Sequence, residues 1–191
     1  MNDEDRLHVR DVAEWRAWLN AHEDASAGVK LVLAKKGVTT PTSLTYAQAL
    51  EEALCSGWID GRRNRIDDVT FLQHFTPRRR RSMWSQRNVA LVEKLTAAGR
   101  MRPRGKAEVD RAKADGRWAG AYAGQAAMEL PDDLAHALQE HPQAALSFNA
   151  MGKTAKYQLI HQVVTAETTT LRQRRIRRIV SKLEQDPGNA P

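Results

Sequence analysis

The sequence predicts an α+β fold in which helices predominate and a small antiparallel sheet lies in the N-terminal half. Apolar residues recur at helical spacing through most of the chain, and only three short stretches between residues 28 and 76 are typical of strands. The 191 residues can enclose one sizeable core with a smaller appended subdomain. We therefore expect a mixed α/β core domain over residues 1–118, a linker over 119–130 and a C-terminal helical subdomain over 131–191.

The chain begins with a predicted helix over residues 11–22. Asp11 followed by Glu14 has the form of a capping box, and the apolar residues after it fall on one helical face. Residues 28–37 are bounded by glycines and are rich in β-branched and apolar residues, which favours a strand because the stretch is too short for a helix.

A second helix is expected after Thr45, which forms another capping box with Gln48. Gly57 is placed to end this helix in the left-handed conformation. Two further strands are predicted, a short one over residues 58–61 that enters a turn and one over residues 69–75, and these complete the small sheet.

Helical segments fill the rest of the chain. We expect helices over residues 85–98 and 103–116, each followed or ended by a glycine. Pro131 precedes two aspartates and marks the next helical start, and another helix begins near Lys153. The last helix is amphipathic and strongly basic, because its apolar residues lie opposite Arg172, Arg174, Arg175, Arg177 and Arg178.

The composition predicts a globular protein of the cytoplasm. Apolar residues make up 41% of the chain and charged residues 28%, which is typical of a folded soluble domain. The single cysteine, Cys55, excludes an intramolecular disulfide and is expected to be a buried, inert thiol. The acidic start of the chain leads into no apolar stretch of signal-peptide or membrane length, so we expect neither.

The positive charge is concentrated in two segments of the sequence. Residues 60–117 carry sixteen basic and seven acidic side chains, a balance of +9, and residues 151–191 carry eight and three, a balance of +5. The remaining segments, 1–59 and 118–150, are acidic, at −3 and −4. Such segregation creates local potentials that attract anions or anionic protein faces.

The most distinctive chemistry lies in four consecutive arginines, Arg78, Arg79, Arg80 and Arg81. Because they follow a proline, we expect their guanidinium groups to fan to both sides of a strand or loop, where they match phosphate or carboxylate oxygens. With Ser82 they form the predicted ligand-binding site, and Trp84 would stack on a nucleobase or another flat ligand beside them.

Plainer interpretations of this segment stay open. The arginines would equally suit a solvated edge strand, or would pair with Asp67, Asp68 or the acidic residues of segment 118–150. The indole of Trp84 would equally serve as a buried anchor for the following helix. The other tryptophans, Trp15, Trp18, Trp58 and Trp118, are expected in the core.

Further candidates flank this segment. Arg62 and Arg63 extend the predicted ligand site, and Asp60 is a weak candidate for a general base, with an Asx turn or a pairing with Arg62 or Arg63 as the alternative. In the last helix, Arg174, Arg175 and Arg178 form a secondary basic patch for nucleic acid or an anionic membrane, unless they simply face water. Whether the two basic segments form one patch stays open.

Motifs for catalysis, metals and cofactors are absent. The six histidines show no metal-ligand spacing and one cysteine cannot build a zinc cluster, so we expect no metal and no cofactor. The sequence contains neither a nucleophile elbow nor a Gly-rich phosphate loop. We therefore favour a non-enzymatic protein over an enzyme.

A resemblance to a known family follows from the order and spacing of several motifs. They are Leu33-Ala34-Lys35-Lys36-Gly37, Leu44-Thr45-Tyr46, the stretch 49–55, Gly57-Trp58-Ile59-Asp60-Gly61, Phe75-Thr76-Pro77-Arg78-Arg79, Gly99-Arg100-Met101, the stretch 112–118 and Arg174-Arg175-Ile176. Over residues 12–184 the chain resembles the bacteriocin-protection family called YdeI or OmpD-associated (OmdA). The resemblance implies protection against antimicrobial peptides and association with an outer-membrane porin, and it brings no catalytic residues.

Three hypotheses about function follow. The first is a protein of antimicrobial stress protection that binds an anionic or flat small molecule or peptide at the arginines and Trp84. The second is a nucleic-acid-binding module, based on the +9 balance of residues 60–117. The third is an enzyme that uses Asp60 on an anionic substrate held by arginines. The oligomeric state is not specified by the sequence.

Overall fold

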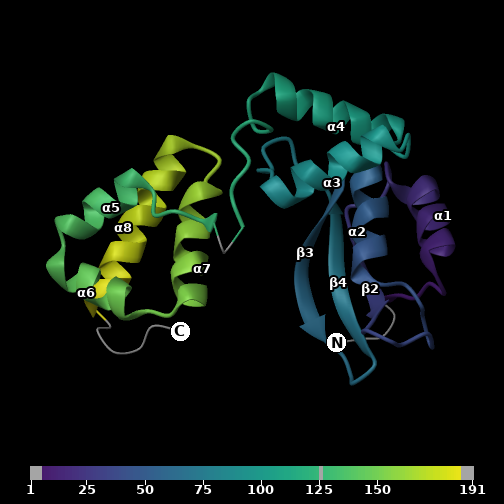
Figure 1. Ribbon diagram of the computed structural model, residues 1–191, viewed down its shortest axis with the longest axis horizontal. Coiled ribbons are helices and arrows are strands. Elements are labelled where there is room, and N and C mark those ends of the chain that lie inside the picture. Colours follow the sequence, from purple (N-terminus) through teal and green to yellow (C-terminus); the bar gives the residue numbers. More distant parts are fainter. Residues whose placement is uncertain (1–5, 125–126, 186–191) are drawn as a thin grey trace. The chain divides into compact units, whose positions relative to one another are not determined.

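The computed structural model describes residues 6–124 and 127–185 and confirms the predicted α+β class with a predominance of helix (Figure 1). The described residues divide into two compact units. The N-terminal unit contains those up to Arg81 together with Asn88–Ala119, and the C-terminal unit contains Ser82–Arg87 together with those from Gly120 onward. Of the predicted linker 119–130, residues 125 and 126 lie outside the described residues, and the rest contain neither an α-helix nor a strand.

The N-terminal unit contains a four-stranded sheet in the order β1-β2-β4-β3. Its strands are β1 (Arg6–Leu7), β2 (Val29–Ala34), β3 (Trp58–Arg65) and β4 (Thr70–Pro77). The pairs β2–β4 and β4–β3 are antiparallel as predicted, whereas the short β1 adds a parallel pair beside β2 that the sequence did not indicate. β3 also continues to Arg65 instead of turning near Gly61, because pairing with β4 holds its polar second half extended.

Four helices accompany the sheet: α1 (Val12–His22), α2 (Tyr46–Cys55), α3 (Gln86–Ala97) and α4 (Pro103–Ala114). The Asp11 side chain accepts the backbone N–H groups of Ala13 and Glu14, and Thr45 forms the complete capping box with Gln48, so both predicted helix starts are confirmed. Gly57 has a φ of 70° and ends α2 in the left-handed region as predicted.

Aromatic side chains join α1 to the sheet. Trp15 and Trp58 are fully buried, and the ring of Trp15 lies 5.6 Å from that of Phe75 on β4. Trp18 stacks on Trp15 at 5.3 Å and is partly buried, as is Trp118. Cys55 is a free, buried thiol as predicted, and burial raises its pKa.

The end of α2 meets the start of α4 at unusually close range. A Cβ atom on Gly105 would lie 2.2 Å from the carbonyl oxygen of Cys55, so only glycine permits this approach. The same carbonyl accepts the backbone N–H of Arg102 at 3.0 Å. This contact fixes the segment before α4, which carries two of the arginines described below, against the C-terminal turn of α2.

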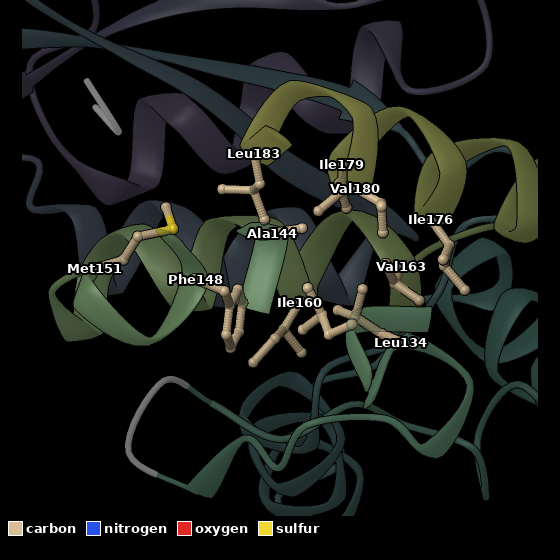
Figure 2. Packing of buried hydrophobic residues seen from close by; sticks show 11 residues of the cluster. Leu134, Ala144, Phe148, Met151, Ile160, Val163, Ile176, Ile179, Val180 and Leu183 are labelled. Carbon is tan, nitrogen blue, oxygen red and sulfur yellow. The ribbon is translucent and has the colours of Figure 1, made fainter. Parts of the chain in front are cut away.

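The C-terminal unit contains α5 (Asp132–Gln139), α6 (Pro142–Ala150), α7 (Lys153–Val164) and α8 (Thr169–Gln185). α6 was not predicted. Figure 2 shows the apolar cluster that these helices share, in which Leu134, Phe148, Val163 and Ile179 come from the four helices in turn. Among all the helices of the described residues, none has both the length and the apolar character needed to cross a membrane.

Candidate anion-binding site

The predicted arginine segment, residues 78–81, leaves the sheet directly after β4. The backbone N–H of Arg78 donates to the carbonyl of Gly57 at 3.0 Å, and the Arg78 side chain is buried, with 8% of the residue exposed. Arg79, Arg80 and Arg81 are exposed. Arg80 and Arg81 form no ion pair with any residue that the structure describes. One arginine of the segment is therefore buried and three are exposed, and Arg80 and Arg81 present charge to solvent without an ion-pair partner among the described residues.

Two carboxylates considered as partners of this segment have other contacts. Asp68 pairs with Arg65 at 2.9 Å. Asp67 accepts the backbone N–H groups of Val69 and Thr70, and these bonds lower its pKa. Among the described residues neither aspartate forms an ion pair with Arg80 or Arg81, so the alternative of neutralisation by Asp67 and Asp68 does not hold for those two arginines.

The two other members of the predicted site are less accessible. Trp84 has only 1% of its surface exposed, which agrees with the alternative that its indole is a buried anchor and leaves no open ring face for stacking. Ser82 is partly buried. A ligand held by the exposed arginines would therefore be selected by charge and not by an aromatic face.

Arg62 and Arg63 lie elsewhere on the hairpin. Arg63 is paired with Gln73, whereas Trp58 is paired with Pro77 beside the arginine segment. Since a strand rises about 3.3 Å per residue, Arg63 is about 15 Å from that end of the hairpin. Its guanidinium lies 3.8 Å above the ring of Phe71, a cation–π contact. The structure therefore does not join Arg62 and Arg63 with residues 78–81.

The weak catalytic candidate has a neutral partner. Asp60 accepts a 2.8 Å hydrogen bond from the hydroxyl of Tyr46 on α2. It forms no ion pair with Arg62 or Arg63 in the described part of the chain, so the alternative of an arginine pairing is wrong. This phenol contact orients the carboxylate of Asp60.

The secondary basic patch belongs to the C-terminal unit. Arg175 donates to the Gln162 carbonyl at 2.5 Å, and Arg178 donates to the Gln162 side chain at 3.0 Å, so both side chains tie α8 to α7. Arg174 is exposed and has no partner among the described residues. Two of the three predicted binding residues thus have structural contacts.

The structure reveals a charged cluster that the sequence analysis missed. Glu52 on α2 has only 2% of its side chain exposed, yet its carboxylate is surrounded by three guanidinium groups. Arg16 donates from Nε at 3.0 Å and from Nη2 at 2.7 Å, Arg100 from Nη2 at 2.8 Å and Arg102 from Nη2 at 2.5 Å. We call these four side chains the Glu52 cluster.

The electrostatics of the cluster favour an ionised glutamate. Burial by itself would raise the pKa of Glu52, but hydrogen bonds from Arg16, Arg100 and Arg102 outweigh that effect and lower the pKa to about 2. The carboxylate in turn raises the pKa of Arg16. Glu52 therefore remains ionised at neutral pH, with three guanidinium groups around its carboxylate.

The Glu52 cluster lines a hollow of about 280 Å³. Its side chains carry a balance of +2, which becomes +1 when Glu51, paired with Arg100 at 2.6 Å, is included. Arg16 is 51% exposed and Arg100 36%, so solvent reaches the cationic side of the hollow. Arg102 is held more firmly, since it also donates to the Glu52 carbonyl and the Ser56 hydroxyl.

One signal in the sequence pointed to this cluster. Glu52 lies between Ala49 and Ala53, on the apolar stripe of its helix, and a carboxylate in that position must be paired when it is buried. Its partners lie 36, 48 and 50 residues away along the chain, so helical periodicity did not identify them. The described residues contain no group of three or more His, Cys, Asp or Glu suited to a metal ion.

Comparison with known proteins supports the resemblance in the C-terminal unit. Residues 127–186 match the family model of bacteriocin-protection, YdeI or OmpD-associated proteins (OmdA), which supports a role associated with bacteriocin protection. Residues 7–108, where most of the motifs quoted above lie, match the model of a domain of unknown function, DUF8412. No curated protein and no solved structure matches the chain. The DUF8412 match covers more than half of the chain, so the chain belongs to the DUF8412 family. It combines that domain with an OmdA-like C-terminal region.

Proposed function

We propose that this chain is a cytoplasmic, non-enzymatic binding protein that serves bacteriocin protection by capturing a compact anion, a phosphate or carboxylate group, in the hollow of the Glu52 cluster. The observation that carries the proposal is the buried Glu52 carboxylate, which holds three guanidinium groups around a solvent-accessible hollow with an excess of positive charge. An enzyme based on Asp60 has no comparable support.

The geometry of the cluster lowers the cost of binding. Long arginine side chains lose conformational freedom when they grip a ligand, and that loss weakens binding at a flexible surface. Here Glu52 already fixes Arg16 by two hydrogen bonds, and Glu51 fixes Arg100. The remaining N–H groups of these forks can therefore meet phosphate or carboxylate oxygens with little further ordering.

The arginine segment contributes long-range attraction. Both basic regions are attached to the junction between α2 and β3, because Arg102 donates to the Cys55 carbonyl and Arg78 donates to the Gly57 carbonyl. The backbone of Arg78, two residues before the exposed Arg80, is thus tied to the same stretch, residues 55–57, as the backbone of Arg102. Like charges gathered in this way raise the local concentration of anions.

Titration calorimetry with inorganic phosphate and with citrate tests the proposal. We expect measurable binding by the full chain and at least about a tenfold weaker affinity in Arg16→Gln, the most exposed member of the cluster. Arg111→Gln is the matched control, because Arg111 is 47% exposed and pairs with the buried Glu108 at 2.5 Å but lies outside the hollow. Its affinity should equal that of the unaltered chain.

Two results would overturn the proposal. One is the absence of heat with both anions, and the other is an equal loss in the Arg16 and Arg111 variants. A single-stranded oligonucleotide is the third titrant. Binding that is unaffected by Arg16→Gln, is abolished by joint replacement of Arg80 and Arg81 by glutamine and falls steeply between 50 and 200 mM salt would favour the nucleic-acid hypothesis instead.

A further inference from the structure

The C-terminal unit contains a pocket that differs chemically from the Glu52 cluster. Its volume is about 630 Å³, which lies within the range of small-molecule sites. Met128, Leu130, Phe148 and Ile160 supply apolar walls, and these come from the segment before α5, from α6 and from α7. The pocket is therefore suited to a ligand with a sizeable apolar part.

The charged residues of this pocket are all of one sign. Lys153 and Lys156 line it, and among the residues that the structure describes no Asp or Glu does. Lys156 donates to the Asn149 carbonyl at 3.0 Å and lies 5.7 Å from the Phe148 ring, so its ammonium group is held next to the apolar wall. Lys153, on the first turn of α7, is exposed and has no partner among the described residues. The ammonium group of Lys156 is thus held in place, and that of Lys153 is available to a ligand.

We propose that this pocket binds a single-chain amphipathic carboxylate, such as a medium-chain fatty acid, with the alkyl chain against Met128, Phe148 and Ile160 and the carboxylate at Lys153 and Lys156. An apolar interior favours an alkyl chain, and two lysines in a lining whose described residues include no acid favour a negative head group. The proposal is independent of the anion site in the N-terminal unit, since no residue is shared.

The structure predicts how affinity depends on the ligand. Each methylene buried in an apolar pocket strengthens binding about fourfold, so decanoate, with two more methylenes, should bind about sixteenfold more tightly than octanoate. Decanol, which has the same chain length without the charge, should bind more weakly than decanoate because it gains nothing from the lysines. The dependence on chain length reports the apolar walls, and the comparison with decanol reports the ammonium groups.

Methyl NMR on the full chain provides the test, with the methyl groups of Met128 and Ile160 as reporters and octanoate, decanoate and decanol as probes. Lys153→Met should weaken the binding of decanoate several-fold and leave the affinity for decanol unchanged. Lys182→Met on α8, an exposed lysine outside the pocket, is the control and should change neither. Leu130→Glu, at a position that is 37% exposed, places a negative charge in the lining of the pocket. This charge repels the carboxylate of decanoate and should also weaken its binding.

Three outcomes would overturn the inference. They are the absence of shifts at Met128 and Ile160 with decanoate, equal affinity for decanoate and decanol, and equal effects of the Lys153 and Lys182 substitutions. A folded Leu130→Glu variant that binds decanoate as tightly as the unaltered chain would also contradict it, because the carboxylate of the ligand could not then lie in this pocket.

Discussion

The two units of this chain bury different kinds of side chain. Over its described residues, the N-terminal unit buries four charged side chains, Glu52, Arg78, Glu108 and Arg117. The C-terminal unit, over its described residues, buries one polar side chain, Ser147, together with Trp84 and an apolar cluster of Leu, Ile, Val, Phe, Met and Ala (Figure 2). Buried charge is costly unless it is paired with a group of opposite charge. The fold of the N-terminal unit must therefore bring oppositely charged side chains together, which the C-terminal unit does not require.

Ion pairs show the same difference. In the C-terminal unit, Arg172 pairs with Asp133 at 2.6 Å, with side chains 30% and 43% exposed. This pair ties α8 to α5 at the surface, where water competes for both groups. In the N-terminal unit the partners of Glu52 have replaced water as its hydrogen-bond donors. Apolar packing therefore accounts for the C-terminal helices, whereas the N-terminal unit also depends on a charged network.

The largest effect expected from this comparison is that of Glu52→Gln. The substitution removes the negative charge that Arg16, Arg100 and Arg102 share and should lower the free energy of unfolding of the N-terminal unit by about 3–5 kcal/mol. Hydrogen exchange followed by mass spectrometry measures each unit separately. Protection should fall in α2 and the sheet and remain unchanged in α5–α8.

Asp133→Asn is the matched change in the other unit. It also removes one carboxylate from an arginine pair, but at a half-exposed site, so the expected loss is under about 1 kcal/mol. Equal losses in the two variants would contradict the distinction between a buried network and a surface pair.

Acid should destabilise the N-terminal unit through the protonation of Glu52. The pKa of Glu52 is lowered to about 2 in the folded protein, from 4.5 as its ordinary value, so the unfolded chain takes up the proton first. The resulting stabilisation is fully present above about pH 4.5 and is lost as pH falls towards 2, about 3 kcal/mol in total.

Urea denaturation at pH 7, 4 and 3 measures this loss. We expect the midpoint of the N-terminal unit, followed by the fluorescence of Trp15 and Trp58, to fall with pH. In the Glu52→Gln variant, the part of this fall in the urea midpoint that comes from Glu52 should be absent. A fall that persists undiminished in the variant would assign the acid sensitivity to other carboxylates.

The regular elements were predictable from the sequence where the determining residues are close together in the chain. Asp11, Thr45 and Gly57 act within four residues of the helix ends that they define. Pairing between distant segments escaped such patterns. The parallel contact of β1 with β2 and the extension of β3 to Arg65 both depend on a neighbouring strand and not on local propensity.

The candidate site was predictable only in its charge. Four adjacent arginines identified a basic end of the sheet, and Arg80 and Arg81 are indeed exposed there. The buried state of Trp84 and the convergence of Arg16, Arg100 and Arg102 on Glu52 depend on tertiary packing. Spacing along the chain contains no information about that packing, so a network assembled from three elements stayed hidden.

The smallest predicted effect concerns helix capping, which differs between helices. α1 and α2 begin with a side-chain cap, whereas α4, α5, α6 and α7 have no side-chain cap bond. Thr45→Ala removes the hydroxyl that accepts the Gln48 N–H and should cost about 1 kcal/mol in thermal or urea unfolding.

Thr170→Ala in α8 is the control for this prediction. Thr170 is exposed and has no side-chain bond to any described residue, so the same chemical change there should be neutral or slightly stabilising, because alanine has the higher helix propensity. If Thr45→Ala lowers the stability and Thr170→Ala does not, the hydroxyl of Thr45 acts as a cap. Equal effects of the two substitutions would mean that the start of α2 is fixed by its packing, and the network around Glu52 would then be the main feature that positions that helix.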